Sequence, residues 1–192
     1  MKRTLLMAAS LALLLLQPIY ASANHFYTTD KTGEKAVEAG YRLEGIAGYV
    51  YATLQPGTIA IYRWFSTGSG DHLMTADTNG ENAAAVGYQD EGLRFYCSKN
   101  QQPEAVAFNR WHHLGTGMHF YTTDAGGEAA PALGYLHEGV MCYVYLNDGP
   151  DLVPLYRWVK TENIAKKHPP ECWFRCREDD QGRQICSREC RP

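Results

Sequence analysis

The chain has 192 residues, of which 18 are Lys or Arg and 21 are Asp or Glu, and its net charge is −3. A mildly acidic chain without a basic patch argues against nucleic acid and against anionic membrane surfaces as partners. Apart from residues 5–16, no apolar stretch approaches the length that a membrane-spanning helix needs. We therefore expect no membrane span.

Residues 1–23 have the three parts of a secretory signal peptide. Lys2 and Arg3 are basic, residues 5–16 are apolar but too short to span a bilayer, and residues 21–23 form an A-x-A cleavage site. Removing this segment takes away two cations and no anions, which shifts the net charge from −3 to −5. The sequence thus predicts a secreted protein, extracellular or periplasmic. Its six cysteines all lie in the exported part and predict disulfides.

From residue 24 to residue 160 the sequence repeats itself every 47 residues, without an insertion. The landmarks that return are a histidine, a Glu-Gly pair, a Gly-Tyr pair and an Arg-Trp pair, for example His25, His72 and His119. Such self-similarity indicates a repeat architecture. We expect a three-unit domain over 24–160, a linker over 161–171 and a cysteine-rich segment over 172–192.

Each unit is predicted to contain a strand, a second strand, a short helix and a third strand. In the middle unit these are residues 59–65, 72–75, 79–85 and 92–97, with Gly87 as a C-cap of the helix. The first unit begins at His25 without an Arg-Trp strand before it, whereas a surplus Arg-Trp strand ends the third unit. We infer that the last strand pairs beside the first. The predicted fold is mostly β (α+β), a pseudo-threefold closed ring of trefoil-like, small-barrel or propeller type, because closure removes exposed sheet edges.

The C-terminal segment contains two Cys-x3-Cys pairs that lie nine residues apart. Cysteines four apart share one face of a helix, which predicts a disulfide-stapled helical hairpin with nested pairing. Three connectivities are possible, and zinc binding is the alternative use of these thiols. The residues concerned are Cys172, Cys176, Cys186 and Cys190.

The pattern Y-R-W…G-D-H…G-Y…E-G-I-A-G-Y-V-Y…P-G-T resembles a secreted, mainly bacterial repeat family of uncharacterised function. It lies here in residues 62–64, 70–72, 40–41, 44–51 and 56–58. The family implies no catalytic residue. The third unit departs from it at Asn109 and at Met118. The cysteine segment is similar in spacing to the helical hairpins of plant defence peptides, some of which inhibit trypsin through a basic loop residue; this resemblance implies that role for Arg183.

The repeated aromatic, imidazole and acidic residues are the predicted ligand contacts. An exposed tryptophan beside polar glycine loops suits a sugar, because the ring stacks on C–H groups while polar groups bind the hydroxyls. The opposing interpretation places these aromatic side chains in the core. The histidines are either structural, per-unit ligands, or a shared tri-histidine metal site. The predicted set is Trp64, Trp111, Trp158, His25, His72, His119 and Asp71.

Strand alternation puts Arg63 on the same face as Ile59 and Ile61, so an inward guanidinium needs a partner. One glutamate per unit is available, which predicts structural ion pairs among Arg63, Arg110, Arg157, Glu44, Glu91 and Glu138. The alternative is an arginine that grips a carboxylate ligand. Cys97 and Cys142 occupy the third strands of neighbouring units with the same side-chain parity, and we expect a disulfide between them.

No hydrolase or zinc-protease motif occurs, and the sequence predicts neither catalytic residues nor a metal nor a cofactor. The leading hypothesis is a non-enzymatic, lectin-like protein whose partner is a glycan or another cell-surface ligand, bound at up to three equivalent sites. The alternatives are a protein-directed inhibitor or toxin-like effector acting through the cysteine segment, and a tri-histidine metal-dependent hydrolase.

Overall fold

The structure, a computed structural model, describes residues 23–161, 171–178 and 184–191. The predicted signal peptide therefore lies outside the described residues except for Ala23, and most of the predicted linker lies outside them as well. None of the helices in the described ranges is long and apolar enough to cross a membrane.

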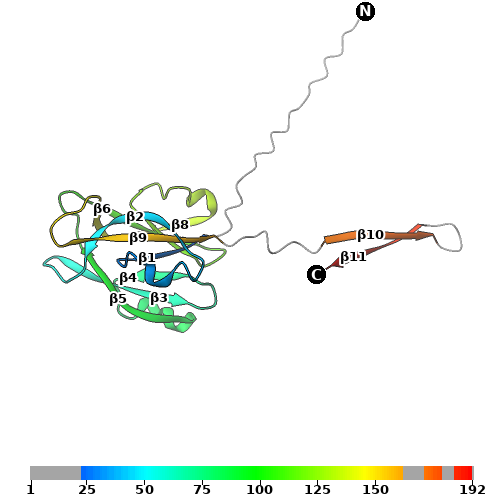
Figure 1. Ribbon diagram of the computed structural model, residues 1–192, viewed down its shortest axis with the longest axis horizontal. Coiled ribbons are helices and arrows are strands. Elements are labelled where there is room, and N and C mark those ends of the chain that lie inside the picture. Colours follow the sequence, from blue (N-terminus) through cyan, green and yellow to red (C-terminus); the bar gives the residue numbers. More distant parts are fainter. Residues whose placement is uncertain (1–22, 162–170, 179–183, 192) are drawn as a thin grey trace, which may run out of the picture.

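Nine strands form three equivalent units, in each of which one strand pairs with two others (Figure 1). Unit 1 consists of β9 (Leu152–Thr161) between β1 (Ala23–Thr28) and β2 (Arg42–Tyr51). Unit 2 consists of β3 (Thr58–Ser66) between β4 (His72–Thr75) and β5 (Tyr88–Ser98). Unit 3 consists of β6 (Ala105–His113) between β7 (His119–Thr122) and β8 (Tyr135–Tyr145). The inferred pairing of the last repeat strand with the first is confirmed: β9 runs antiparallel to β1, with Trp158 opposite Phe26.

The predicted closed ring is wrong, because the strands form one open sheet. Its path is β1-β9-β2-β5-β8-β6-β7, with β3 and β4 branching from β5. The units meet through single residue pairs, Tyr51 with Tyr96, Tyr49 with Tyr145 and Ser98 with Tyr143. The short strands β1, β4 and β7 pair on one side only within the described sheet. A single residue pair between neighbouring units is too little to continue the hydrogen-bond ladder from unit to unit, as a closed trefoil, barrel or propeller requires.

Buried side chains satisfy the unpaired backbone of these short strands. The Tyr27 hydroxyl on β1 donates to the Tyr121 carbonyl at 2.6 Å and accepts from the Tyr121 N–H at 3.0 Å. The Tyr121 hydroxyl on β7 makes the same two contacts with Met74 on β4, at 3.0 and 2.7 Å. Met74, the third equivalent residue, has no hydroxyl. The Tyr27 carbonyl therefore accepts a hydrogen bond from Arg63 Nη1, at 3.1 Å. Strand edges that the ladder leaves open are thus protected inside the molecule.

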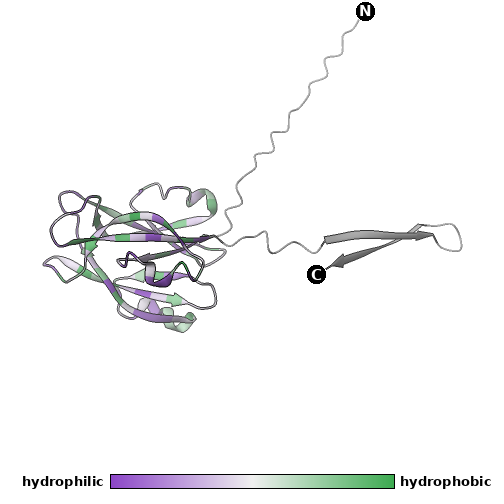
Figure 2. Ribbon diagram, viewed as in Figure 1, coloured by the Kyte–Doolittle hydropathy of each residue, from purple (hydrophilic) through white to green (hydrophobic). Residues whose placement is uncertain are grey.

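The central core is built from equivalent positions of the three units. It contains the sets Tyr27, Met74, Tyr121; Ile61, Phe108, Leu155; and Val50, Cys97, Val144; together with Phe95 and Cys142. The predicted disulfide between Cys97 and Cys142 is confirmed and links β5 to β8. Hydrophobic and hydrophilic residues alternate along the strands, as expected for a sheet that buries one face (Figure 2).

The three predicted short helices are 3-10 turns rather than α-helices. They are η1 (Gly33–Lys35), η2 (Gly80–Val86) and η3 (Pro131–Leu133). Gly87 ends η2 in the left-handed conformation, as predicted. The glutamates that follow the repeated glycine, Glu34, Glu81 and Glu128, also have positive φ, which interrupts a regular helix at its first turn.

The predicted helical hairpin is wrong as well. Residues 171–178 and 184–191 form the antiparallel strands β10 (Glu171–Glu178) and β11 (Gln184–Arg191). Cysteines four apart lie on one face of a strand as well as of a helix, so their spacing could not separate the two. The backbone register places Cys172 opposite Cys190 and Cys176 opposite Cys186, the order of the nested pairing; the bridges themselves stay a prediction.

Candidate functional site

Each junction between two units contains an arginine held by two glutamates. Arg110 reaches Glu138 within its own unit through Nε at 2.8 Å and Glu81 of the preceding unit through Nη1 at 2.5 Å. Arg157 does the same with Glu44 at 2.9 Å and Glu128 at 2.7 Å, and Arg63 with Glu91 and with Glu34 at 2.8 Å. The structure thus brings together every arginine and glutamate that the sequence pairs. The second glutamate of each junction, which sequence reasoning missed, recurs every 47 residues after a T-x-D-x-x-G motif.

That motif is a turn that aims the second glutamate at the arginine. In unit 3, Asp124 accepts the N–H groups of Gly126 and Glu128 at 2.9 and 2.8 Å, and the Thr122 hydroxyl donates to Glu128 at 2.7 Å. Burial raises the pKa of Glu128, but the hydrogen bonds from Arg157 and Thr122 outweigh it and keep that pKa below its usual value. The first glutamate is aimed differently, because a β-bulge beside Gly45 turns Glu44 toward Arg157.

The repeated tryptophans are structural. Trp64, Trp111 and Trp158 are only 5–7% exposed, and each lies against the glycine of a T-x-D-x-x-G turn. A Cβ added to Gly80 would lie 2.4 Å from the Trp64 ring, and one added to Gly33 or Gly127 would lie 2.6 or 2.5 Å from Trp158 or Trp111. The structure therefore does not present these rings to a sugar.

The three repeated histidines lie at different junctions and face different partners. On the adjacent strand of its own unit, His25 lies opposite Val159, His72 opposite Phe65, and His119 opposite His112. We name each junction after its histidine. The residue opposite the histidine is one of the differences between the junctions.

The His72 junction is closed. Phe65 lies over the imidazole, with ring centroids 4.7 Å apart, and Phe26 from unit 1 lies 5.0 Å from it on another side. His72 is 7% exposed, and burial, with a smaller effect of the Arg63 charge, lowers its pKa to about 3. A neutral, enclosed imidazole of this kind has a packing role.

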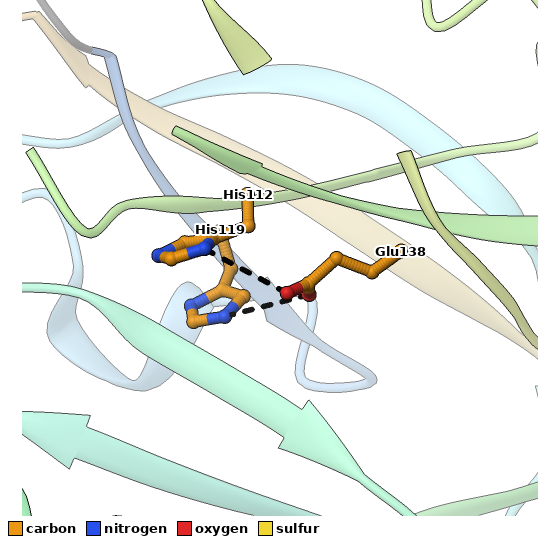
Figure 3. Close-up of side chains that lie close together, drawn as sticks. All are labelled: His112, His119 and Glu138. Carbon is orange, nitrogen blue, oxygen red and sulfur yellow. Dashed lines mark ion pairs between the residues drawn. The ribbon is translucent and has the colours of Figure 1, made fainter. Parts of the chain in front are cut away.

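The His119 junction is filled by polar side chains. Asp71, 1% exposed, accepts the His119 N–H and approaches His119 Nδ1, both at 2.6 Å, and also accepts from the Tyr88 hydroxyl at 2.8 Å. Burial raises the pKa of Asp71, but its hydrogen bonds from His119 outweigh this and hold the pKa below its usual value. His112 stacks on His119, with ring centroids 4.6 Å apart, and Glu138 approaches both rings (Figure 3).

His112, His119 and Glu138 are the group in the described residues whose ligand atoms, all within 4.8 Å of one another, could hold a metal ion. Two features oppose this use. Glu138 Oε2 already accepts from Arg110 at 2.8 Å, and the imidazole planes are only 15° apart. A metal lies near the plane of each imidazole that binds it, and two stacked rings share no such point without turning. The structure does not bring His25, His72 and His119 together, so it offers no tri-histidine site; the absence of a metal or cofactor stays a prediction.

The His25 junction is open. It contains a pocket of about 240 Å³, between unit 1 and unit 3. Its apolar walls include Phe120, Leu133 and Val159, and its polar groups include His25, Arg42, Glu44 and Arg157. Of the predicted ligand residues, His25 therefore lines this pocket, whereas Asp71, His72 and His119 are buried at the other two junctions.

Residues 19–98 and residues 85–169 each match the same family model, which is described as Domain of unknown function (DUF5648). The chain belongs to this family. Two matches agree with the repeated domain that the 47-residue spacing predicts. No curated protein and no solved structure matches the chain.

Proposed function

We propose that the protein is a secreted, non-enzymatic binding protein that takes a carbohydrate in the pocket at the His25 junction. The observation that carries this proposal is that, among the described residues, a pocket lies beside His25, whereas Phe65 encloses His72 and Asp71 and His112 enclose His119. The pocket exists where Val159 stands opposite the histidine, and the aromatic residues Phe65 and His112 stand in its place at the other two junctions. We therefore propose one carbohydrate site, at the His25 junction, instead of the three equivalent sites expected from the sequence.

The walls of the pocket suit one face of a sugar ring. Leu133, 37% exposed, supplies accessible apolar surface, and the largely buried side chains of Phe120, Tyr135 and Val159 line the pocket beside it. Sugar rings present C–H groups on a face, which pack against such surface, and hydroxyls around their rim. The volume lies somewhat below the roughly 300–1,000 Å³ of sites for drug-sized ligands, which favours a single ring over an extended chain.

The charged groups around the pocket favour a neutral ligand. Arg157 is held by Glu44 at 2.9 Å and by Glu128 at 2.7 Å, so its charge is already balanced. His25 Nε2 lies 3.5 Å from Glu44, and Arg42 lies 3.9 Å from it. Carboxylates and guanidinium groups that are fixed in this way can still exchange hydrogen bonds with hydroxyls. They offer no uncompensated charge for a strongly ionic ligand.

Export supports an extracellular carbohydrate as the ligand. Residues 1–23 have the charge and hydropathy of a signal peptide, and the resemblance to a secreted, mainly bacterial repeat family agrees with this. We infer that the protein meets its ligand outside the cell or in the periplasm. An exported binding domain of this kind fits a glycan at a cell surface.

Val159→Phe tests the proposal, because it installs at the open junction the residue that fills the His72 junction. A glycan array selects the sugar, and calorimetric titration then measures its affinity for the wild type, for Val159→Phe and for Val159→Ala, the matched control that keeps the pocket open. We expect Val159→Phe to weaken binding at least tenfold, which is about 1.4 kcal/mol, and Val159→Ala to retain it. No binding of any sugar at millimolar concentration, or equal binding by Val159→Phe, would contradict the proposal.

A further inference from the structure

Two further cavities lie at equivalent places beside the Glu-Arg-Glu groups, on the side away from the repeated histidines. One, of about 210 Å³, is lined by Glu81, Arg110, Glu138 and Met141. The other, of about 150 Å³, is lined by the equivalent residues Glu128, Arg157, Glu44 and Ala47. The repeat spacing of 47 residues maps Ala47 onto Arg94 and Arg94 onto Met141.

At the third equivalent place the chain supplies its own occupant. Arg94 lies beside Glu34 and Glu91, which are equivalent to the glutamates that line the two cavities. Its Nη1 lies 3.7 Å from Glu34, and its Nη2 donates to the Glu91 carbonyl. The side chain is 25% exposed, and its Nε is buried. The arrangement of two glutamates and one arginine that lines both cavities therefore accommodates a second guanidinium group at the third place.

The charges differ by one between the occupied place and the cavity beside Met141. Around Arg94, two carboxylates face two guanidinium groups, those of Arg63 and Arg94. Beside Met141, the equivalent carboxylates, Glu81 and Glu138, face Arg110, the one Lys or Arg within 4.0 Å of either among the described residues. The imidazoles of His112 and His119 also approach Glu138, at 3.6 and 3.9 Å. Beside Ala47, Arg42 also approaches Glu44, at 3.9 Å. The cavity beside Met141 is the larger of the two, and its two carboxylates face one arginine where those around Arg94 face two.

We propose that the cavity beside Met141 binds an alkylguanidinium group. A guanidinium is planar and presents its N–H donors as a fork that matches carboxylates and carbonyls. Arg94 uses one of these donors for the Glu91 carbonyl and lies 3.7 Å from Glu34, while its buried Nε has no hydrogen-bond partner among the described residues. Met141 lines the cavity, and Val140, 46% exposed, lies at its side, so both can pack along the alkyl stem. The group can come from a small molecule or from an arginine side chain of a partner polypeptide. This site lies at the His119 junction and does not depend on sugar binding at the His25 junction.

The experiment titrates the full-length protein with two guanidinium probes, agmatine and the peptide acetyl-Gly-Arg-Gly-amide. The control peptide carries citrulline, a neutral side chain of nearly the same shape, in place of arginine. We expect saturable binding of a guanidinium probe and at least tenfold weaker binding of the citrulline peptide. Tighter binding of agmatine indicates a small-molecule ligand, and tighter binding of the arginine peptide indicates a polypeptide partner; either result supports the guanidinium chemistry.

Two variants exchange residues that the chain already carries at equivalent positions. Met141→Arg fills the cavity with an internal guanidinium and should weaken binding at least tenfold. Arg94→Met empties the occupied place and should raise the stoichiometry by one site. The second variant tests the proposal even where the first fails to fold. No saturation by either probe below about 10 mM, equal binding of the citrulline peptide, or an unchanged stoichiometry in Arg94→Met would overturn the proposal.

Discussion

The His72 and His25 junctions have the same backbone pairing and the same Glu-Arg-Glu group but opposite contents. At the His72 junction, Phe65 covers the imidazole at 4.7 Å, and Arg63 is 1% exposed. At the His25 junction, Val159 occupies the position of Phe65, and a pocket of about 240 Å³ remains. The residue opposite the histidine is one difference between the packed junction and the pocket. We infer that the repeat provides a frame and that positions which differ between the units control where a ligand can enter.

The residues that are the same in all three units belong to the frame. They include the glycine under each tryptophan, the Thr and Asp of each turn, and the arginine with its two glutamates. The units differ at positions 65, 112 and 159 and at positions 47, 94 and 141, which face the junctions. Repeated residues thus hold the units together and also line the pocket and the cavities, whereas the residues that differ change what each junction contains.

The largest expected effect comes from breaking the frame. Gly80→Ala places a Cβ 2.4 Å from the Trp64 ring at a φ of +63°, which adds overpacking to backbone strain. We expect a loss of about 3 kcal/mol in the free energy of unfolding, measured by urea denaturation. Gly33→Ala and Gly127→Ala should cost similar amounts, since their glycines meet Trp158 and Trp111 in the same way. A cost confined to one unit would show that the frame is not shared.

Opening the closed junction should have the next largest effect. Phe65→Val leaves the His72 ring uncovered, as Val159 leaves the ring of His25. The lost packing and the new cavity should lower the free energy of unfolding by about 2 kcal/mol. A crystal structure of the variant should show a second pocket beside His72. A refilled junction without a cavity would mean that position 65 does not control access.

Acidification should affect the closed junction through His72. Its pKa falls from 6.5 to about 3 because of burial and the nearby Arg63, with Asp71 and Glu34 opposing and Arg94 adding to the effect. The unfolded chain therefore takes up this proton first, and the stabilisation present above pH 6.5 is lost as the pH falls toward 3, at about 1.4 kcal/mol per pH unit. His72→Phe should remove this slope from denaturation curves recorded between pH 6.5 and 5. The same slope in both proteins would place the titrating group elsewhere.

The smallest expected effect on stability comes from closing the open junction. Val159→Phe fills a space that is already empty, and a phenylalanine is tolerated at the equivalent position, so the free energy of unfolding should change by less than about 1 kcal/mol. Thermal denaturation of the variant and the wild type checks this. A loss of several kcal/mol would show that the pocket cannot accept a ring.

The three units, the ion pairs and the disulfide could be predicted from the sequence, because a period of 47 residues places equivalent residues in equivalent surroundings. The pairing of β1 with β9 followed from the surplus Arg-Trp strand, and the disulfide from the parity of Cys97 and Cys142. The open sheet was not predictable in this way, since a repeat does not say how far neighbouring units share a ladder. Here hydroxyls such as that of Tyr121 satisfy the edges that closure would otherwise remove.

The candidate sites were harder to predict, because repetition drew attention to Trp64 and its equivalents, which are buried. The pocket and the cavity beside Met141 are lined in part by residues that differ between the units, such as Val159 and Met141. These positions can be found by aligning the three units. Only the three-dimensional contacts show which of them face a junction.

A backbone amide NMR titration of the full-length protein, with the sugar selected on the glycan array, tests directly whether the ligand enters the His25 junction. We expect chemical-shift changes at His25, Phe120, Ala130 and Val159, with the His72 and His119 junctions unperturbed. Equal changes at all three junctions, or changes confined to residues 171–191, would contradict it.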